Sequence, residues 1–111
     1  MMHYRETDPE FTERLEHFAY DEVVNEPGQQ LDAVTRHMVI LATLLGCQGM
    51  EVFRQELPQA LDAGVTPVMA KEIVYQAVDY LGMGRVLPFL DITNEVLSAR
   101  GVALPLEGQA A

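Results

Sequence analysis

The stretch ALDAGVTP at residues 60–67 ends one predicted helix and begins the next. Gly64 follows an amphipathic segment and suits the left-handed position after a helix C-terminus, because glycine has no Cβ. Thr66 can then cap a new helix that has Pro67 in its first turn. The stretch therefore predicts two consecutive helices joined by a tight connection.

Helical periodicity extends on both sides of this connection. Residues 50–63 and 67–81 carry apolar side chains three and four positions apart. The second of these segments has two adjacent apolar stripes, which predict two packing partners. After the Gly82-Met83-Gly84 interruption, a further helix is predicted to about Ala99, with Pro88 as a candidate kink.

Two more helices are predicted nearer the N-terminus. Thr7 or Asp8 can cap a helix that runs to about Val24. Residues 31–45 are apolar around most of the helical circumference, which predicts a central, buried helix. No strand-like alternation competes with this pattern, so the fold class is all-α, a compact bundle of about five to six helices.

Charge and composition indicate one small helical domain. Hydrophobic residues make up 49% of the 111 residues, which excludes a disordered chain despite the formal charge of −10. We expect an acidic helical arm at residues 1–26, a helical domain at residues 27–100 and a loose tail at residues 101–111. The arm holds eight Asp or Glu against two Arg. Nucleic acid is therefore not an expected ligand, because phosphate binding needs clustered Lys and Arg.

Neither a membrane span nor a secretory leader is expected. The longest apolar stretch, residues 38–47, is about half of the ~20 residues that a span requires. Charged residues stand near the N-terminus where a signal peptide would be apolar, so we expect a cytoplasmic protein. The chain has one cysteine, which rules out an intrachain disulfide and argues against a structural metal site.

Two ionisable residues fall among apolar neighbours. Glu56 lies inside the apolar arc of residues 50–63, where partial desolvation favours its neutral form and suits proton transfer near neutral pH. His37 lies on the line of Leu41 and Leu44 and can exchange a proton near neutral pH. A structural ion pair for Glu56 and a hydrogen-bonded core position for His37 are the alternatives.

Cys47 is the only thiol and stands between two predicted helices. The amide groups at the start of the second helix could favour a thiolate there, which makes Cys47 a candidate nucleophile. An inert packing role is the alternative, since unpaired cysteine is among the most buried residue types.

The quoted stretch belongs to a longer pattern. It is followed by Glu72-Ile73 and Tyr80-Leu81-Gly82, and it is preceded by the stretch TRHMVILA at residues 35–42. In order and spacing these pieces resemble the carboxymuconolactone decarboxylase and alkylhydroperoxidase D-like family over roughly residues 31–90. The resemblance implies a helical subunit that assembles into homo-oligomers, commonly trimers or hexamers.

The peroxidase branch of that family carries Glu on one helix, then Cys-x-x-Cys and a His on the next. When positions are counted back from Gly64 without gaps, His37 falls at the family's Glu position and Glu56 at its His position. Gly49 and Val52 fall at the two Cys positions. A dithiol mechanism therefore has no cysteine pair here. Gly84 also replaces a proline that is common after Tyr-x-Gly.

The resemblance to the decarboxylase branch implies a lyase that needs no cofactor or metal. We expect a small lactone or carbonyl acid as substrate, with Glu56 and His37 as acid/base residues in exchanged positions. Arg36 and Arg85 are candidate anchors for a substrate carboxylate, and Tyr80 is a further candidate contact. A one-cysteine peroxidase acting through Cys47 and a catalytically silent oligomer remain the alternatives.

Overall fold

The computed structural model describes residues 3–107, and every regular element in that range is helical. The prediction of an all-α fold is confirmed. In chain order the elements are α1 (Tyr4–Thr7), α2 (Pro9–His17), the π-helix η1 (Phe18–Glu22), α3 (Ala33–Gly46), α4 (Met50–Asp62), α5 (Pro67–Leu81) and α6 (Met83–Ala99). No helix in this range is long and apolar enough to cross a membrane.

The chain divides into two units, the first ending at Leu31 and the second beginning at Asp32. The N-terminal unit contains α1, α2 and η1. Asp8 takes the N-cap position of α2 as predicted, but its carboxylate accepts a hydrogen bond from the Thr7 hydroxyl (2.7 Å) instead of a helix amide. Residues 1–2 of the predicted arm lie outside the described range.

The prediction of one regular α-helix to about Val24 is wrong beyond His17. From Phe18 the chain forms a π-helix, in which the Val23 amide donates to the Phe18 carbonyl at 3.0 Å. This hydrogen bond spans five residues instead of four. The apolar spacing did not distinguish the two kinds of turn, because both continue the helix in nearly the same direction.

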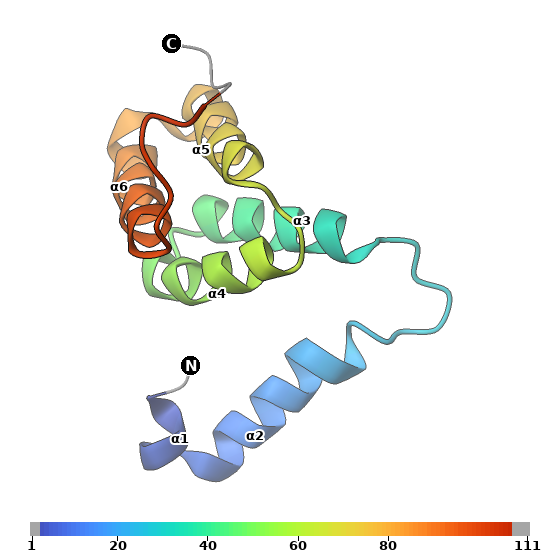
Figure 1. Cartoon of the computed structure of the whole chain (residues 1–111). Coiled ribbons are helices and arrows are strands. Elements are labelled where there is room, and N and C mark those ends of the chain that lie inside the picture. Colours follow the sequence, from blue (N-terminus) through green and yellow to red (C-terminus); the bar gives the residue numbers. More distant parts are fainter. Residues whose placement is uncertain (1–2, 108–111) are drawn as a thin grey trace. The chain divides into compact units, whose positions relative to one another are not determined.

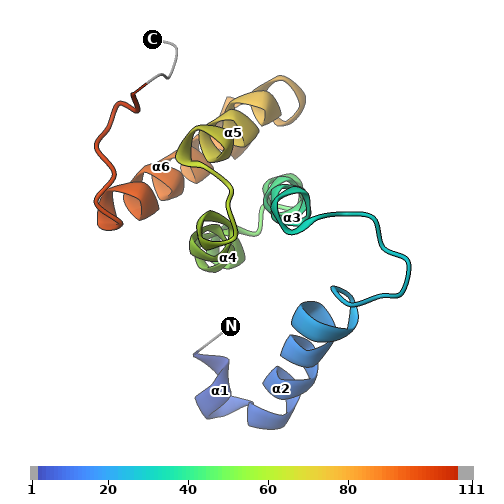
Figure 2. The same cartoon turned by 45° about the vertical axis from the view of Figure 1, so that its right-hand side comes forward.

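The C-terminal unit contains two helical pairs. In Figures 1 and 2, α3 lies beside α4, and α5 lies beside α6. The pairs are joined because α3 also packs against α5, and α4 against α6. The helix α5 thus contacts both α3 and α6, which confirms the two partners predicted from its two stripes.

The connection between α4 and α5 has the predicted form. Gly64 has a φ of 115°, and the amide of Val65 donates to the carbonyl of Ala60 at 3.0 Å. Thr66 then caps α5, since its hydroxyl accepts a hydrogen bond from the Met69 amide at 3.1 Å. These local bonds satisfy backbone groups that a helix end leaves without partners.

Asp32 forms the N-cap of α3. Its carboxylate accepts a hydrogen bond from the Thr35 amide at 2.8 Å. The hydrogen bond from the Thr35 amide, and to a smaller extent one from the Thr35 side chain, hold the pKa of the Asp32 carboxyl below its ordinary value. They do so because they stabilise the charged form. The capping hydrogen bond from the Thr35 amide is therefore strongest when Asp32 is ionised.

The hydrophobic core lies between the two helical pairs of the C-terminal unit. Its buried members are Leu41, Leu45, Phe53, Leu57, Ala60, Val65, Ala70, Val74, Val86, Phe89, Ile92 and Val96. Beyond α6 the chain has no further helix up to residue 107, although Leu106 is buried. Residues 108–111 of the predicted tail lie outside the described range.

The prediction that residues 31–45 form a central, buried helix is wrong for part of the helix surface within the C-terminal unit. Only Leu41 and Leu45 of α3 are buried, whereas Val39 is 49% exposed. Helices α4 and α5 cover only part of the circumference of α3. An apolar face of this helix is consequently open.

Candidate functional site

Glu56 lies on the core face of α4. Its neighbours along that face include Phe53, Leu57 and Ala60, all of which are buried. The Glu56 residue is only 5% exposed, so the burial expected from the sequence is confirmed. A carboxyl group in such surroundings has little direct access to water.

His37 lies on α3, the helix that packs against α4. The residue is half-buried, and its Nδ1 atom is buried without a hydrogen-bond partner. Glu56 and His37 therefore stand on neighbouring helices of one unit. Within residues 3–107, no three His, Cys, Asp or Glu side chains are grouped so that they could hold a metal ion.

Cys47 is exposed and follows the last residue of α3. Its Sγ atom donates a hydrogen bond to the carbonyl oxygen of Leu44 at 3.7 Å. Only the protonated thiol can make this bond. The thiol thus bonds to the helix that precedes it, whereas the sequence pointed to the amides at the start of α4.

The three candidate substrate contacts lie on three different helices. Arg36 is half-buried on α3, Arg85 is exposed in the first turn of α6, and Tyr80 is 84% exposed near the end of α5. Of these three, only Tyr80 lines an apolar groove between α3 and α5.

Lys71 is a buried lysine that the sequence pattern did not single out. It lies on α5 and is 7% exposed. A signal was present, since Lys71 stands three and seven positions before Val74 and Val78 and so borders their stripe. Lysine usually keeps its ammonium group in water, and for this reason the pattern alone favoured an exposed position.

An apolar groove of about 480 Å³ runs between α3 and α5. None of its lining residues is charged. They are Thr35, Met38, Val39, Ala42 and Leu45 on α3, with Ile73, Gln76, Ala77 and Tyr80 on α5. Such a groove favours an apolar occupant and offers hydrogen bonds only from Thr35, Gln76 and Tyr80.

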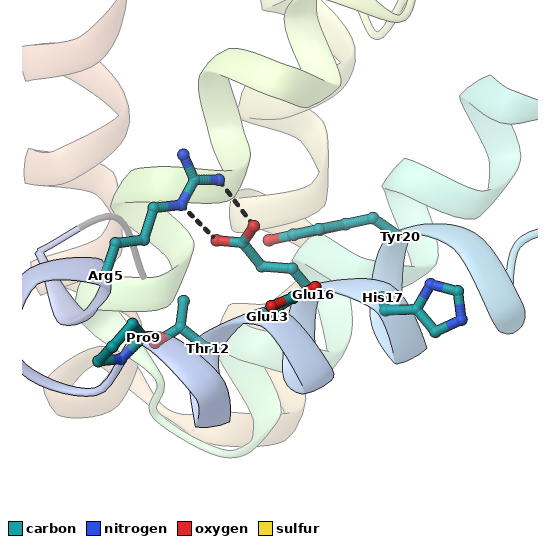
Figure 3. A pocket seen from close by; sticks show the side chains of 7 residues that line it. All are labelled: Arg5, Pro9, Thr12, Glu13, Glu16, His17 and Tyr20. Atoms are coloured by element: carbon teal, nitrogen blue, oxygen red, sulfur yellow. Dashed lines mark hydrogen bonds and ion pairs between the residues drawn. The ribbon is translucent and has the colours of Figure 1, made fainter.

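A second hollow, of about 470 Å³, lies on the N-terminal unit (Figure 3). Arg5 donates two hydrogen bonds to Glu16 there, at 3.0 and 2.7 Å. The hydrogen bonds with Arg5 hold the pKa of the Glu16 carboxyl below its ordinary value. Because Glu16 already neutralises Arg5, this hollow is poorly suited to an anionic substrate.

The C-terminal unit is thus a helical scaffold in which Glu56 and His37 lie on two packed helices. Comparison with family models assigns a more specific class, since the carboxymuconolactone decarboxylase family model matches residues 9–95. The chain belongs to this family, and the resemblance noted in the sequence is confirmed. No curated protein and no solved structure matched the chain.

Proposed function

We propose that the chain is a cofactor-independent lyase that acts on a small lactone or carbonyl acid. Glu56 and His37 would be its acid/base residues. The observation that carries the proposal is the burial of the Glu56 carboxyl group on α4, beside the helix that bears His37. Buried carboxyl groups of this kind are common at sites of proton transfer.

The proposed chemistry is decarboxylation next to a conjugated carbonyl group. Loss of carbon dioxide leaves the bonding electron pair on the carbonyl system as an enolate, and a protonated side chain then returns a proton to carbon. Glu56 is the proposed donor of that proton. His37, on the packed helix α3, is the proposed group from which Glu56 regains it.

A carboxylate substrate also needs a cation in an otherwise acidic protein. Arg36 and Arg85 are the proposed anchors, with Tyr80 as a further contact. The burial of Lys71 adds a third cation to these candidates, since an ammonium group binds a carboxylate more strongly when it is removed from water.

The test compares Glu56→Gln with Glu51→Gln across a panel of lactones and carbonyl acids. Glu51 lies on the same helix, but its side chain is 77% exposed. We expect Glu56→Gln to lower kcat by roughly 10²–10⁴-fold, the usual contribution of a general acid or base. The control should keep the parent rate, and circular dichroism should show that both variants are folded.

Equal rates for the parent and Glu56→Gln on every turned-over substrate would contradict the acid/base role. If the parent turns over no member of the panel and binds none, the alternative of a silent oligomer is favoured. A one-cysteine peroxidase is the other alternative, and the exposed thiol of Cys47 is compatible with it.

We also propose that the chain assembles into a homo-oligomer, as membership of the family implies. The open apolar face of α3 supports this proposal, because a partner subunit would remove it from water. Sedimentation velocity over a range of protein concentrations tests it directly.

A further inference from the structure

The N-terminal helical segment has an exposed apolar stripe. Phe11, Leu15 and Phe18 stand four and three positions apart, so they share one face of the segment. They are 64%, 37% and 58% exposed, respectively. A helical segment this short is only marginally stable without a packing partner. An apolar surface that covers the stripe would therefore stabilise the segment.

The groove between α3 and α5 is an apolar surface of the opposite shape. Two small residues, Ala42 and Ala77, are among its lining residues and leave room between the helices. Val39 and Tyr80, also in the lining, are 49% and 84% exposed. A convex helix face can enter such a groove and remove both apolar surfaces from water.

The two surfaces also agree in length and in charge. Phe11 and Phe18 are seven residues apart, as are Ile73 and Tyr80, the first and last lining residues on α5, which is about 10 Å of helix in each case. The α3 wall is longer and runs from Thr35 to Leu45. The stripe and the groove lining contain no charged side chain. Contact between them would thus bury no unpaired charge, which would otherwise be costly.

We infer that the Phe11, Leu15 and Phe18 stripe of one copy docks into the α3/α5 groove of a second copy. This inference rests on the proposed self-assembly and specifies which surfaces meet. Each surface is open within its own unit, so each chain offers one stripe and one groove. Such an exchange of arms joins copies without requiring a change in the C-terminal unit.

The first test compares the self-association of the full chain with that of two variants. Phe11→Ala removes part of the stripe, whereas Tyr4→Ala removes an aromatic ring of α1, 48% exposed, that is not in the stripe. By sedimentation, we expect Phe11→Ala to weaken association about tenfold or more, as the loss of a buried aromatic side chain would. Tyr4→Ala should associate like the parent.

The second test uses disulfide trapping between two differently tagged chains, both carrying Cys47→Ser. One chain bears Leu15→Cys in the stripe, and the other bears Ala42→Cys in the groove. We expect mild oxidation to give the mixed disulfide in excess of random pairing. Because each chain has a single cysteine, a mixed product can form only between copies.

The outcomes separate this inference from the proposed assembly. A parent chain that stays monomeric overturns both. If the parent assembles but Phe11→Ala associates as strongly as the parent, the arm exchange alone is overturned. The same holds if the Ala42→Cys chain forms disulfides only with other Ala42→Cys chains and none with the Leu15→Cys chain. A chain carrying both cysteines that closes only on itself also overturns it, because the stripe would then occupy its own groove.

Discussion

The rings of Phe53 and Phe89 meet edge to face, with centroids 5.1 Å apart and planes at 89°. Both side chains are buried, at 1% and 0% exposure, and they join α4 to α6. Phe53 lies three residues before Glu56 on the same helix. The contact therefore helps to fix the helix that carries the proposed acid/base residue.

Phe89→Ala should destabilise the protein by about 3–5 kcal/mol, because it leaves a cavity opposite Phe53. Leu87→Ala is the matched control, since Leu87 lies on the same helix but is 45% exposed. The control should change the free energy of unfolding by less than about 1 kcal/mol. Urea denaturation measures the free energy of unfolding of both variants. If the two substitutions lower it equally, the contact between the Phe53 and Phe89 rings makes no specific contribution to stability.

Gly64→Ala should destabilise the protein by more than about 1 kcal/mol. The backbone there has a φ of 115°, and an added Cβ would come within 3.0 Å of Val34 Cγ2. Gly84→Ala should have the opposite sign and stabilise by about 0.4–1 kcal/mol, because an added Cβ there meets nothing within 4 Å. Thermal denaturation of the two variants checks the difference in sign.

Asp32→Ala should lower the melting temperature by a few degrees at neutral pH, since the N-cap of α3 is lost. The pKa of Asp32 is lower in the folded chain than its ordinary value of 3.8, so its ionised form stabilises the fold above that pH. This contribution fades as the pH falls through the folded pKa. The difference in melting temperature between the parent and Asp32→Ala should therefore shrink below about pH 4.

Asp32→Asn provides the control for that pH dependence. Asparagine is also a good N-cap residue, but it does not titrate. The melting temperature of Asp32→Asn should therefore stay above that of Asp32→Ala as the pH is lowered. If the gap between parent and Asp32→Ala is instead constant from pH 7 to pH 3, ionisation of Asp32 is not what stabilises the cap.

Cys47→Ser should leave any consumption of peroxide unchanged. The thiol of Cys47 donates to the Leu44 carbonyl, and serine can make the same bond. No second cysteine exists to resolve an oxidised intermediate. A peroxide assay with an external thiol compares the parent and the variant, and a clear loss of activity would favour the one-cysteine peroxidase.

Much of the candidate site could be described from the sequence, but not all of it. The position of Glu56 within the apolar arc of α4 correctly predicted its burial, because helical period and local polarity together define a face. The burial of Lys71 was not foreseen. It depends on how much neighbouring structure covers the edge of a stripe, which spacing along one helix does not reveal.

The amino-acid sequence by itself determined where the helices of the C-terminal unit begin and end. The hydrogen bonds at Gly64, Thr66 and Asp32 join groups at most five positions apart, so the roles of these residues can be read locally. Only the tertiary structure decided that one apolar face of α3 stays open beside α5. The physical reason is that α3 is apolar around most of its circumference, and its neighbours select which part is covered.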